Sequence, residues 1–313
     1  MPAPVAAPPD LPFAVEFGRP ATRAMAPGRG FGLELQIPLL AGDAREVLFS
    51  GPSRPDPHSG LSLFQCGPLR VGCVTEPVTD ERGLAAQSQA LYRRVLAAAR
   101  GTHLYRIWNY VPRINGLCDG FENYRAFCQG RSLAFEATAG TGFQAVLPAA
   151  SAIGTHDGHL SVVFVSGPEE PRHFENPEQM PAYHYPVEHG PRAPSFSRAT
   201  VVRTADRTFA FISGTAAIKG HHTVGAGSLA AQLDCTLDNL RLISRATGHG
   251  ENFAPGPGRR RHFKVYLRHA ADLVTVRTRL DRALLQPTDE VVYLQADICR
   301  APLDLEIEAT LIS

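Results

Sequence analysis

Residues 199–313 alternate short strand patterns with two helical patterns, and this order restricts the fold more than any other feature of the chain. Leucine and isoleucine recur at helical spacing between Ser228 and Thr247, and Gly248 follows as a stop signal. A second helical pattern follows Asp272, a residue type that caps helices. Strands are predicted at Ala199–Arg203, Thr208–Ser213, His262–Arg268, Val291–Ala296 and Leu303–Leu311. The order β-β-α-β-α-β-β predicts an α+β domain with helices on one face of a mixed sheet.

The last strand pattern carries two carboxylates whose role the pattern leaves open. Side chains alternate between the two faces of a strand, so Glu306 and Glu308 share one face and apolar residues occupy the other. Cys299 and Arg300 stand just before the turn that precedes this strand. The shared face is either a solvated surface or the acid of a site.

The earlier half of the chain repeats a similar order. Helices are predicted at Asp80–Arg100 and Glu122–Gln129, and strands at His103–Tyr110, Gly142–Pro148 and Leu160–Ser166. This similarity suggests a diverged duplication. Two such units side by side would form a cleft at their interface, which is a common place for a small-molecule site.

Composition divides the chain into four segments. Residues 1–25 form a Pro/Ala-rich flexible leader, and residues 26–170 form the N-terminal α+β domain. Residues 171–198 connect it to the C-terminal domain, residues 199–313. The prolines of the connection exclude a central strand or a long helix, and its aromatic residues predict a loop packed on the body of the protein.

Charge and hydropathy exclude several classes of protein. A net charge of +1 gives no basic field for nucleic acid, and no apolar run approaches the ~20 residues that span a bilayer. The first residues lack the pattern of a secretory signal, so we expect a cytoplasmic protein without nucleic-acid or membrane partners. The six cysteines include no C-x-x-C pair, and reduced thiols are expected.

Other candidate motifs are weak. His156 and His159, and the pair His221-His222, lie in Gly-rich turns without a partner acid at metal-ligand spacing, so surface histidines and no metal site are predicted. Ser151 and Ser213 are not in a G-x-S-x-G elbow, which argues against a serine hydrolase.

Residues 105–131 are more informative, because they hold the single Trp of the chain together with several Tyr, Arg and Asn residues. Arginine presents a planar fork that suits carboxylate oxygens, and Tyr and Asn can orient a small polar ligand. The alternative is a strand end and helix whose arginines pair with surface acids. The residues alone leave both interpretations open.

Three stretches of the C-terminal part resemble the RidA/YjgF-like domain: FISGTAAIKGHHTVGAGSLAAQLDCTLDNLRLI, KVYLRHAADLVTVRTRLDRAL and YLQADICRAPLDLEIEATL. The resemblance covers residues 199–313 and includes the closing E-I-E strand. Domains of this type alone typically form trimers with sites between subunits, and many are imine deaminases.

The whole chain resembles the chorismatase family. The stretches that carry this likeness are RIWNYVPRIN, ENYRAFCQGR, PAYHYPVEHGPRAPSFSRAT and ADICRAPLDLEIE, in this order over about residues 60–313. The resemblance implies two related RidA-like domains with mixed sheets and helices on one face, in a pseudo-trimer-like arrangement within one chain, and we expect a monomer. It also implies cleavage of the enolpyruvyl ether of chorismate to pyruvate and a second product, without a cofactor.

Site residues follow from the resemblance. Glu306 corresponds to the family's catalytic acid, which must be protonated near neutral pH to protonate the vinyl ether. Arg131 and Arg279 are expected to bind the substrate carboxylates, with Tyr124 as a hydroxyl partner. A small shift in register would replace the two arginines by Arg125 or Arg277.

Two positions bear on the second product. The resemblance implies that a cysteine seven positions before the catalytic Glu, here Cys299, favours 3-hydroxybenzoate, whereas a smaller residue favours a cyclohexadiene diol. Ala216, near the S-G-T-A turn, is more typical of the diol branch, so the two residues disagree. We expect chiefly 3-hydroxybenzoate, with some 4-hydroxybenzoate or the diol as alternatives.

Two further hypotheses belong to other classes. A RidA-like imine deaminase would release ammonia and would not need the N-terminal half, and its Arg-bearing sequence counts against that hypothesis. A non-catalytic protein that binds a small ligand would keep the pocket without using Glu306 as an acid.

Overall fold

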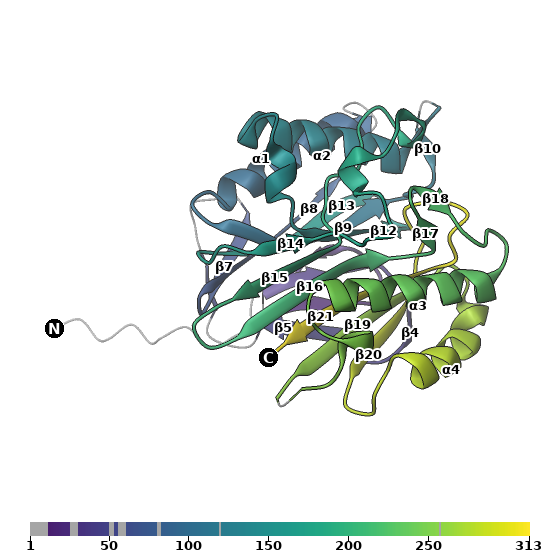
Figure 1. The fold of residues 1–313 in the computed structure, drawn as a ribbon. Helices are drawn as coiled ribbons and strands as arrows, with labels where there is room; N and C mark the ends of the chain where they lie inside the picture. Colours follow the sequence, from purple (N-terminus) through teal and green to yellow (C-terminus); the bar gives the residue numbers. More distant parts are fainter. Residues whose placement is uncertain are drawn as a thin grey trace.

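The computed structural model describes residues 12–25, 31–49, 53–55, 61–79, 83–118, 120–256 and 258–313. Two large sheets lie in the middle of the molecule, with a pair of helices outside each (Figure 1). The helices are α1 (Gly83–Ala98), α2 (Asn123–Ala139), α3 (Leu229–Ala246) and α4 (Leu273–Ala283). The predicted α+β class with mixed sheets is confirmed.

The N-terminal half builds a six-stranded sheet in the order β12-β9-β13-β8-β7-β6. Its strands are β6 (Ser53–Pro55), β7 (Ser62–Cys66), β8 (Leu69–Pro77), β9 (His103–Pro112), β12 (Ala149–Thr155) and β13 (His159–Gly167). A four-stranded sheet, β2-β3-β1-β5, contributes to the same core. It consists of β1 (Phe13–Glu16), β2 (Arg23–Ala24), β3 (Phe31–Glu34) and β5 (Arg45–Phe49), and a small hairpin joins β10 (Leu117–Cys118) to β11 (Phe121–Glu122).

The C-terminal sheet has seven strands in the order β14-β15-β16-β21-β19-β20-β4. They are β4 (Leu39–Ala41), β14 (Arg172–Phe174), β15 (Ala199–Arg203), β16 (Thr208–Thr215), β19 (Arg260–Leu267), β20 (Glu290–Gln295) and β21 (Leu305–Ile312). A two-stranded ribbon of β17 (Ile218–Lys219) and β18 (His222–Thr223) stands beside it. The predicted order of elements in this part is confirmed, and Ser228 caps α3 by accepting a hydrogen bond from the Ala231 amide.

The two closing strands are not neighbours in the sheet. Strand β19 lies between them, parallel to β20 and antiparallel to β21. Residues 296–304 therefore cross the end of β19, and this crossing carries Cys299 and Arg300.

Two local predictions need correction. The strand predicted at Gly142–Pro148 is wrong: Phe143–Val146 form a 3-10 turn, and the next strand begins at Ala149. Helix α2 continues to Ala139, ten residues beyond the predicted end at Gln129. Gly130, the residue after the predicted end, permits close helix packing, because a Cβ there would lie 2.1 Å from the Ala85 carbonyl oxygen of α1.

The sequence predicted that two aspartates, Asp80 and Asp272, begin helices. Asp272 makes no side-chain cap, because a 3-10 turn at Ala270–Asp272 already places it in helical backbone geometry. The predicted start of the first helix at Asp80 lies outside the described residues.

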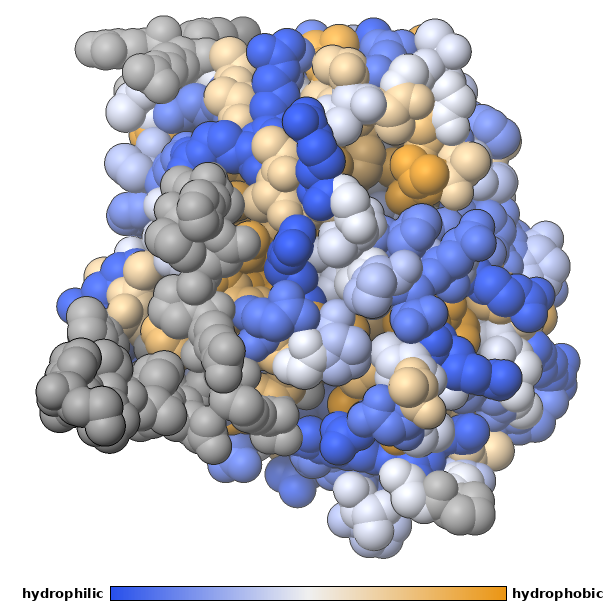
Figure 2. Space-filling model, turned by 90° about the vertical axis from the view of Figure 1, so that its left-hand side faces the viewer, coloured by the Kyte–Doolittle hydropathy of each residue, from blue (hydrophilic) through white to orange (hydrophobic). Residues whose placement is uncertain are grey.

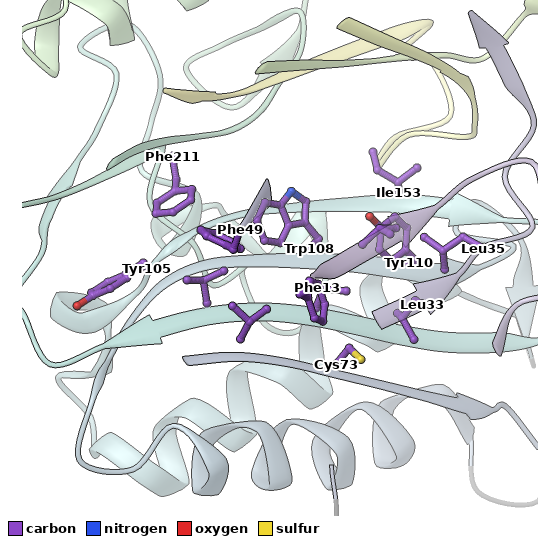
Figure 3. Close-up of a cluster of buried hydrophobic side chains, with 14 of the residues drawn as sticks. Phe13, Leu33, Leu35, Phe49, Cys73, Tyr105, Trp108, Tyr110, Ile153 and Phe211 are labelled. Atoms are coloured by element: carbon purple, nitrogen blue, oxygen red, sulfur yellow. The ribbon is translucent and has the colours of Figure 1, made fainter. Parts of the chain in front are cut away.

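Aromatic side chains fill the space between the two large sheets. Trp108 of β9 meets Phe211 of β16 edge to face, with ring centroids 6.5 Å apart (Figure 3). Isolated bridges, Ala149 with Ser197 and Ile153 with Ile298, link β12 of the N-terminal sheet to segments of the second half. The two halves therefore share one core, and a cavity between them has walls from both.

The connection at residues 171–198 packs on this body as predicted. It consists of β14 and two 3-10 turns, Ala182–His184 and Val187–His189, among irregular segments. Strand β14 pairs with β15, and β4 from the first half pairs with β20. Strands outside residues 199–313 thus extend the C-terminal sheet, and the predicted domain boundaries stay a prediction.

Polar and apolar side chains are interspersed on the face shown in Figure 2. Large exposed hydrophobic residues among the described part of the chain are scattered: Leu117, Val146, Val187 and Val274. Among the described helices, none combines the length and the apolar composition needed to cross a membrane.

Candidate active site

A cavity of about 340 Å³ lies between the two halves of the molecule, and its size suits a small metabolite. Its walls come from β11, α2, β12, the connection, β16, the β17–β18 ribbon, the crossing at residues 296–304 and β21. The polar lining residues are Glu122, Tyr124, Arg125, Arg131, Ser151, Tyr185, His189, Arg198, His221, His222, Thr223, Cys299, Arg300 and Glu306.

Glu306 of β21 lines this cavity as a buried acid. Its side chain is 3% exposed, and its Oε1 atom has no hydrogen-bond partner among the described residues. Gly214 of β16 makes room for it, since a Cβ there would lie 1.8 Å from Oε1. Burial, followed by the negative charge of Glu308, raises the pKa of Glu306 to about 8, although Arg106 and Arg198 act in the opposite direction. Glu306 is therefore protonated at neutral pH and can donate a proton.

Glu308, two residues further along the same face, has the opposite environment. One carboxylate oxygen accepts a hydrogen bond from Arg106 at 2.6 Å, and the other accepts one from the Trp108 indole at 2.7 Å. The ammonium of Lys264 lies 2.9 Å from Oε1 of Glu308, the oxygen that accepts the hydrogen bond from Trp108. Burial alone would raise the pKa of Glu308, but Lys264 and Arg106 lower it to about 2.

These charges belong to a buried network between the halves of the molecule. Lys264 of β19 also donates to Glu46 of β5 at 3.0 Å, and all four ionised side chains are buried. Two carboxylates, Glu46 and Glu308, thus match two cations, Arg106 and Lys264. Because the network is balanced without Glu306, ionisation of Glu306 would add an uncompensated buried charge. The solvated-face alternative for the two glutamates is wrong.

We expect Glu308→Gln to lower the free energy of unfolding by about 3 kcal/mol, because it leaves Arg106 and Lys264 with one buried counterion instead of two. Urea unfolding at pH 7 measures this change. Glu290→Gln is the matched control, since Glu290 pairs with Arg260 at the exposed ends of β20 and β19 in the same sheet and should cost less than about 1 kcal/mol. Equal losses in the two variants would contradict a structural role for the buried network.

Arg131 of α2 is a buried cation at the cavity wall. It is 3% exposed, and its Nε and one terminal nitrogen have no hydrogen-bond partner among the described residues. Its guanidinium lies 5.2 Å from the Tyr92 ring centroid and 5.8 Å from that of Phe135, which hold it by cation–π contact. A buried guanidinium with free donors can bind a carboxylate.

Two further arginines line the cavity from the second half of the chain. Arg198 donates hydrogen bonds to the Met180 carbonyl and the Tyr185 hydroxyl, and its Nε lies 3.9 Å from a carboxylate oxygen of Glu175. Arg300 donates to the His221 carbonyl oxygen at 2.8 Å and to Thr223. The cavity therefore holds cations on several walls, as a ligand with more than one carboxylate would require.

The structure brings together five of the six residues singled out from the sequence. Tyr124, Arg131, Ala216, Cys299 and Glu306 all line the cavity. Burial, followed by the charge of Glu306, raises the pKa of the Cys299 thiol to about 12, so this side chain is a neutral wall of the cavity. Burial also raises the pKa of Tyr124, which stays a neutral hydroxyl.

The sixth residue, Arg279, lies elsewhere, and its expected role needs correction. It is on α4, about half exposed, and pairs with Asp234 of α3 at 2.8 Å. Neither Arg279 nor its alternative Arg277 is among the residues that line the cavity, because α4 covers the outer face of the C-terminal sheet. Arg125 lines the cavity but is bound to Glu122 at its edge.

Sequence reasoning did not identify Arg198 as a cation of the cavity wall. It ends the proline-rich connection, in a stretch that carried the family resemblance. The partners of Glu308 were also missed, because Arg106, Lys264 and Glu46 come from three different strands. Only a pattern of isolated charges within apolar strands could have indicated them.

Comparisons with known proteins identify the family of the chain. A family model described as "Chorismatase FkbO/Hyg5-like, N-terminal" matches residues 49–166. A chorismatase of Streptomyces rapamycinicus is 36% identical over 274 residues, which cover 82% of this chain and 79% of that protein. The chain belongs to the chorismatase family.

Other members and solved structures extend the match. A 3-hydroxybenzoate synthase of Streptomyces hygroscopicus is 39% identical over 216 residues, which span 66% of this chain and 62% of that protein. A crystal structure of a chorismatase matches with a TM-score of 0.80 and 30% identity, covering 96% of this chain and 92% of that one. The chain is thus an enzyme of this family. A RidA structure from Psychrobacter matches 45% of the chain at 19% identity with a TM-score of 0.33.

Proposed function

We propose that this enzyme cleaves the enolpyruvyl ether of chorismate, releasing pyruvate and chiefly 3-hydroxybenzoate. The observation that carries the proposal is a neutral buried carboxyl, Glu306, in a cavity that also holds the unpaired guanidinium of Arg131. Chorismate has two carboxylates and an acid-labile vinyl ether, which match these two features. Both halves of the chain wall the cavity, so one copy supplies the complete proposed site.

Binding precedes the chemistry. Arg131 and Arg198 stand on the walls contributed by the first and second halves, and two nitrogens of Arg131 have no hydrogen-bond partner among the described residues and can bind a substrate carboxylate. Tyr124 supplies a neutral hydroxyl beside them. Apolar lining residues, Ala150, Ala152, Phe196 and Ile218, limit the water that surrounds the bound ring.

Proton transfer from Glu306 starts the reaction. The proton goes to the terminal methylene of the vinyl ether, which becomes a methyl group, and positive charge develops on the carbon beside the ether oxygen. The ionised Glu306 then stabilises this oxocarbenium ion and takes back a proton in the following step. No other group has to supply or accept electrons.

The fate of the cation decides the second product. Attack by water gives a hemiketal that collapses to pyruvate and a cyclohexadiene diol, so this branch consumes one water molecule. Attack by the neighbouring ring hydroxyl leads, after proton loss from the ring, to pyruvate and 3-hydroxybenzoate, and these two products contain all the atoms of chorismate. We propose that the Cys299 thiol excludes water from the cation and favours the second branch.

We expect pyruvate to appear in a one-to-one ratio with an aromatic or diol product when the protein is incubated with chorismate, and kcat/KM to fall above about pH 8. The sign follows from the role of Glu306, which must carry its proton and loses it as the pH rises through its pKa of about 8. Coupled detection of pyruvate between pH 6 and 10 measures both. Absence of pyruvate, or release of ammonia from amino-acid-derived imines instead, would overturn the proposal.

A Cys299→Ala variant should shift the products towards the diol, because the smaller side chain leaves space for water beside the cation. Chromatography of the products, with pyruvate as the internal standard, gives the ratio. Cys118→Ala serves as the control, since this thiol is partly exposed and is not among the residues lining the cavity. An unchanged ratio in Cys299→Ala would remove the thiol from product control.

A further inference from the structure

Two histidines and a glutamate converge at the edge of the cavity. Glu188 and His189 belong to the 3-10 turn Val187–His189 of the connection, and His221 lies between β17 and β18. The side chain of Glu188 is 61% exposed, whereas those of His189 and His221 are 20% and 18% exposed. Because both rings also line the cavity, the cluster stands where the cavity wall reaches the surface.

The three ligand atoms form a compact triangle. His189 Nε2 lies 3.0 Å from His221 Nδ1, and Glu188 Oε1 lies 3.4 Å and 3.3 Å from these two nitrogens. In four-coordinate zinc sites, bonds of 2.0–2.2 Å place neighbouring ligand atoms about 3.3 Å apart. The triangle already has the dimensions of three corners of such a site.

We propose that Glu188, His189 and His221 form a binding site for a zinc-class divalent cation at the rim of the cavity. Two imidazoles and a carboxylate are a donor set that zinc and cobalt accept, and three protein ligands leave one position for water or another small ligand. The sequence could not indicate this site, because the acid that the His221-His222 pair lacks comes from a segment more than thirty residues away.

The surroundings set the conditions for binding. Arg300 donates hydrogen bonds to the His221 carbonyl oxygen and to Thr223, so its positive charge lies close to the cluster and would repel a cation. The negative charge of Glu188 is therefore required, and its loss should weaken binding as strongly as the loss of a histidine.

A bound cation would link the connection, through Glu188 and His189, to the β17–β18 ribbon, through His221. The ring centroid of Tyr185 lies 5.1 Å from that of His189, and the Tyr185 hydroxyl accepts a hydrogen bond from Arg198. A bound metal would thus fix the segment that holds Arg198 in the cavity wall. This effect concerns the architecture of the wall and does not depend on which substrate the enzyme uses.

Cobalt titration of the untagged, reduced protein tests the site. We expect one equivalent of Co²⁺ to bind with the visible bands of a four-coordinate nitrogen and oxygen site, and Zn²⁺ to displace it. Glu188→Gln, His189→Ala and His221→Ala should each weaken binding at least about tenfold. His184→Ala, an exposed histidine of the same connection, should bind as the unchanged protein does.

A melting experiment provides a second readout that does not need the spectrum. Zinc should raise the melting temperature of the unchanged protein and of His184→Ala, but not that of the three cluster variants. Absence of saturable binding, a thiolate charge-transfer band, or equal affinity in all variants would overturn the proposal.

Discussion

Glu306→Gln is expected to reduce kcat for pyruvate release from chorismate by roughly 1,000-fold, the scale of a lost general acid. Glutamine keeps the shape of the side chain but cannot transfer a proton to the methylene. Binding should survive, because the arginines that hold the carboxylates are unchanged. Stopped assays of pyruvate, together with calorimetric titration of chorismate, separate the two effects.

Glu251→Gln is the matched control for this variant, because Glu251 is an exposed acid that pairs with Arg245 far from the cavity lining. It should keep full activity. Turnover within about threefold of the unchanged enzyme in Glu306→Gln would remove Glu306 from the mechanism and favour a protein that binds the ligand without acid catalysis.

Glu306→Gln should also change how the free energy of unfolding depends on pH. The pKa of Glu306 rises from 4.5 to about 8 on folding, so the folded state binds the proton more tightly and loses stability as the pH increases across this range. Glu308 has the opposite sign, because its pKa falls to about 2 and its contribution is lost as the pH drops below 4.5. Glu306→Gln should therefore gain stability relative to the unchanged enzyme between pH 5 and pH 8.

The two glutamates also mark how far the sequence could predict the site. Alternation along β21 placed them on one face but could not distinguish them, since their difference lies in Arg106, Trp108 and Lys264, which are distant in the chain. Family resemblance selected Glu306. The structure supplies the physical reason: Arg106 and Lys264 are paired with Glu308 and Glu46, and burial beside Glu308 keeps the Glu306 carboxyl protonated.

The fold shows the same division between local and long-range information. Helix α3 was predicted within one residue at each end, because its cap, apolar spacing and final glycine are all local. The strand predicted at Gly142–Pro148 failed because Phe143 and Leu147, both buried, are spaced as on a helical turn. Arg279 failed for a longer-range reason: its helix covers the far side of the sheet from the cavity.

Arg131→Met is expected to lower kcat/KM for chorismate roughly 100-fold or more, mainly through KM, while leaving the folded protein as stable as before or more stable. The loss of activity follows from the removal of a desolvated partner for a substrate carboxylate. The stability follows from burial, since two nitrogens of Arg131 have no hydrogen-bond partner among the described residues and the cation has to be kept out of water. Methionine can still pack on the rings of Tyr92 and Phe135.

A variant that loses activity but keeps or gains stability has lost an arginine that binds the ligand. A variant that loses stability has lost a structural arginine. Steady-state kinetics and urea unfolding of the same preparation measure the two quantities. Arg279→Met is the matched control, because its guanidinium pairs with Asp234 on the surface and its loss should change neither quantity appreciably. A structural role for Arg131 would instead lower stability by more than about 2 kcal/mol, with KM unchanged in the fraction that remains folded. Partial recovery of KM in Arg131→Lys would show that the charge itself binds the substrate, since lysine keeps the charge but loses the planar fork.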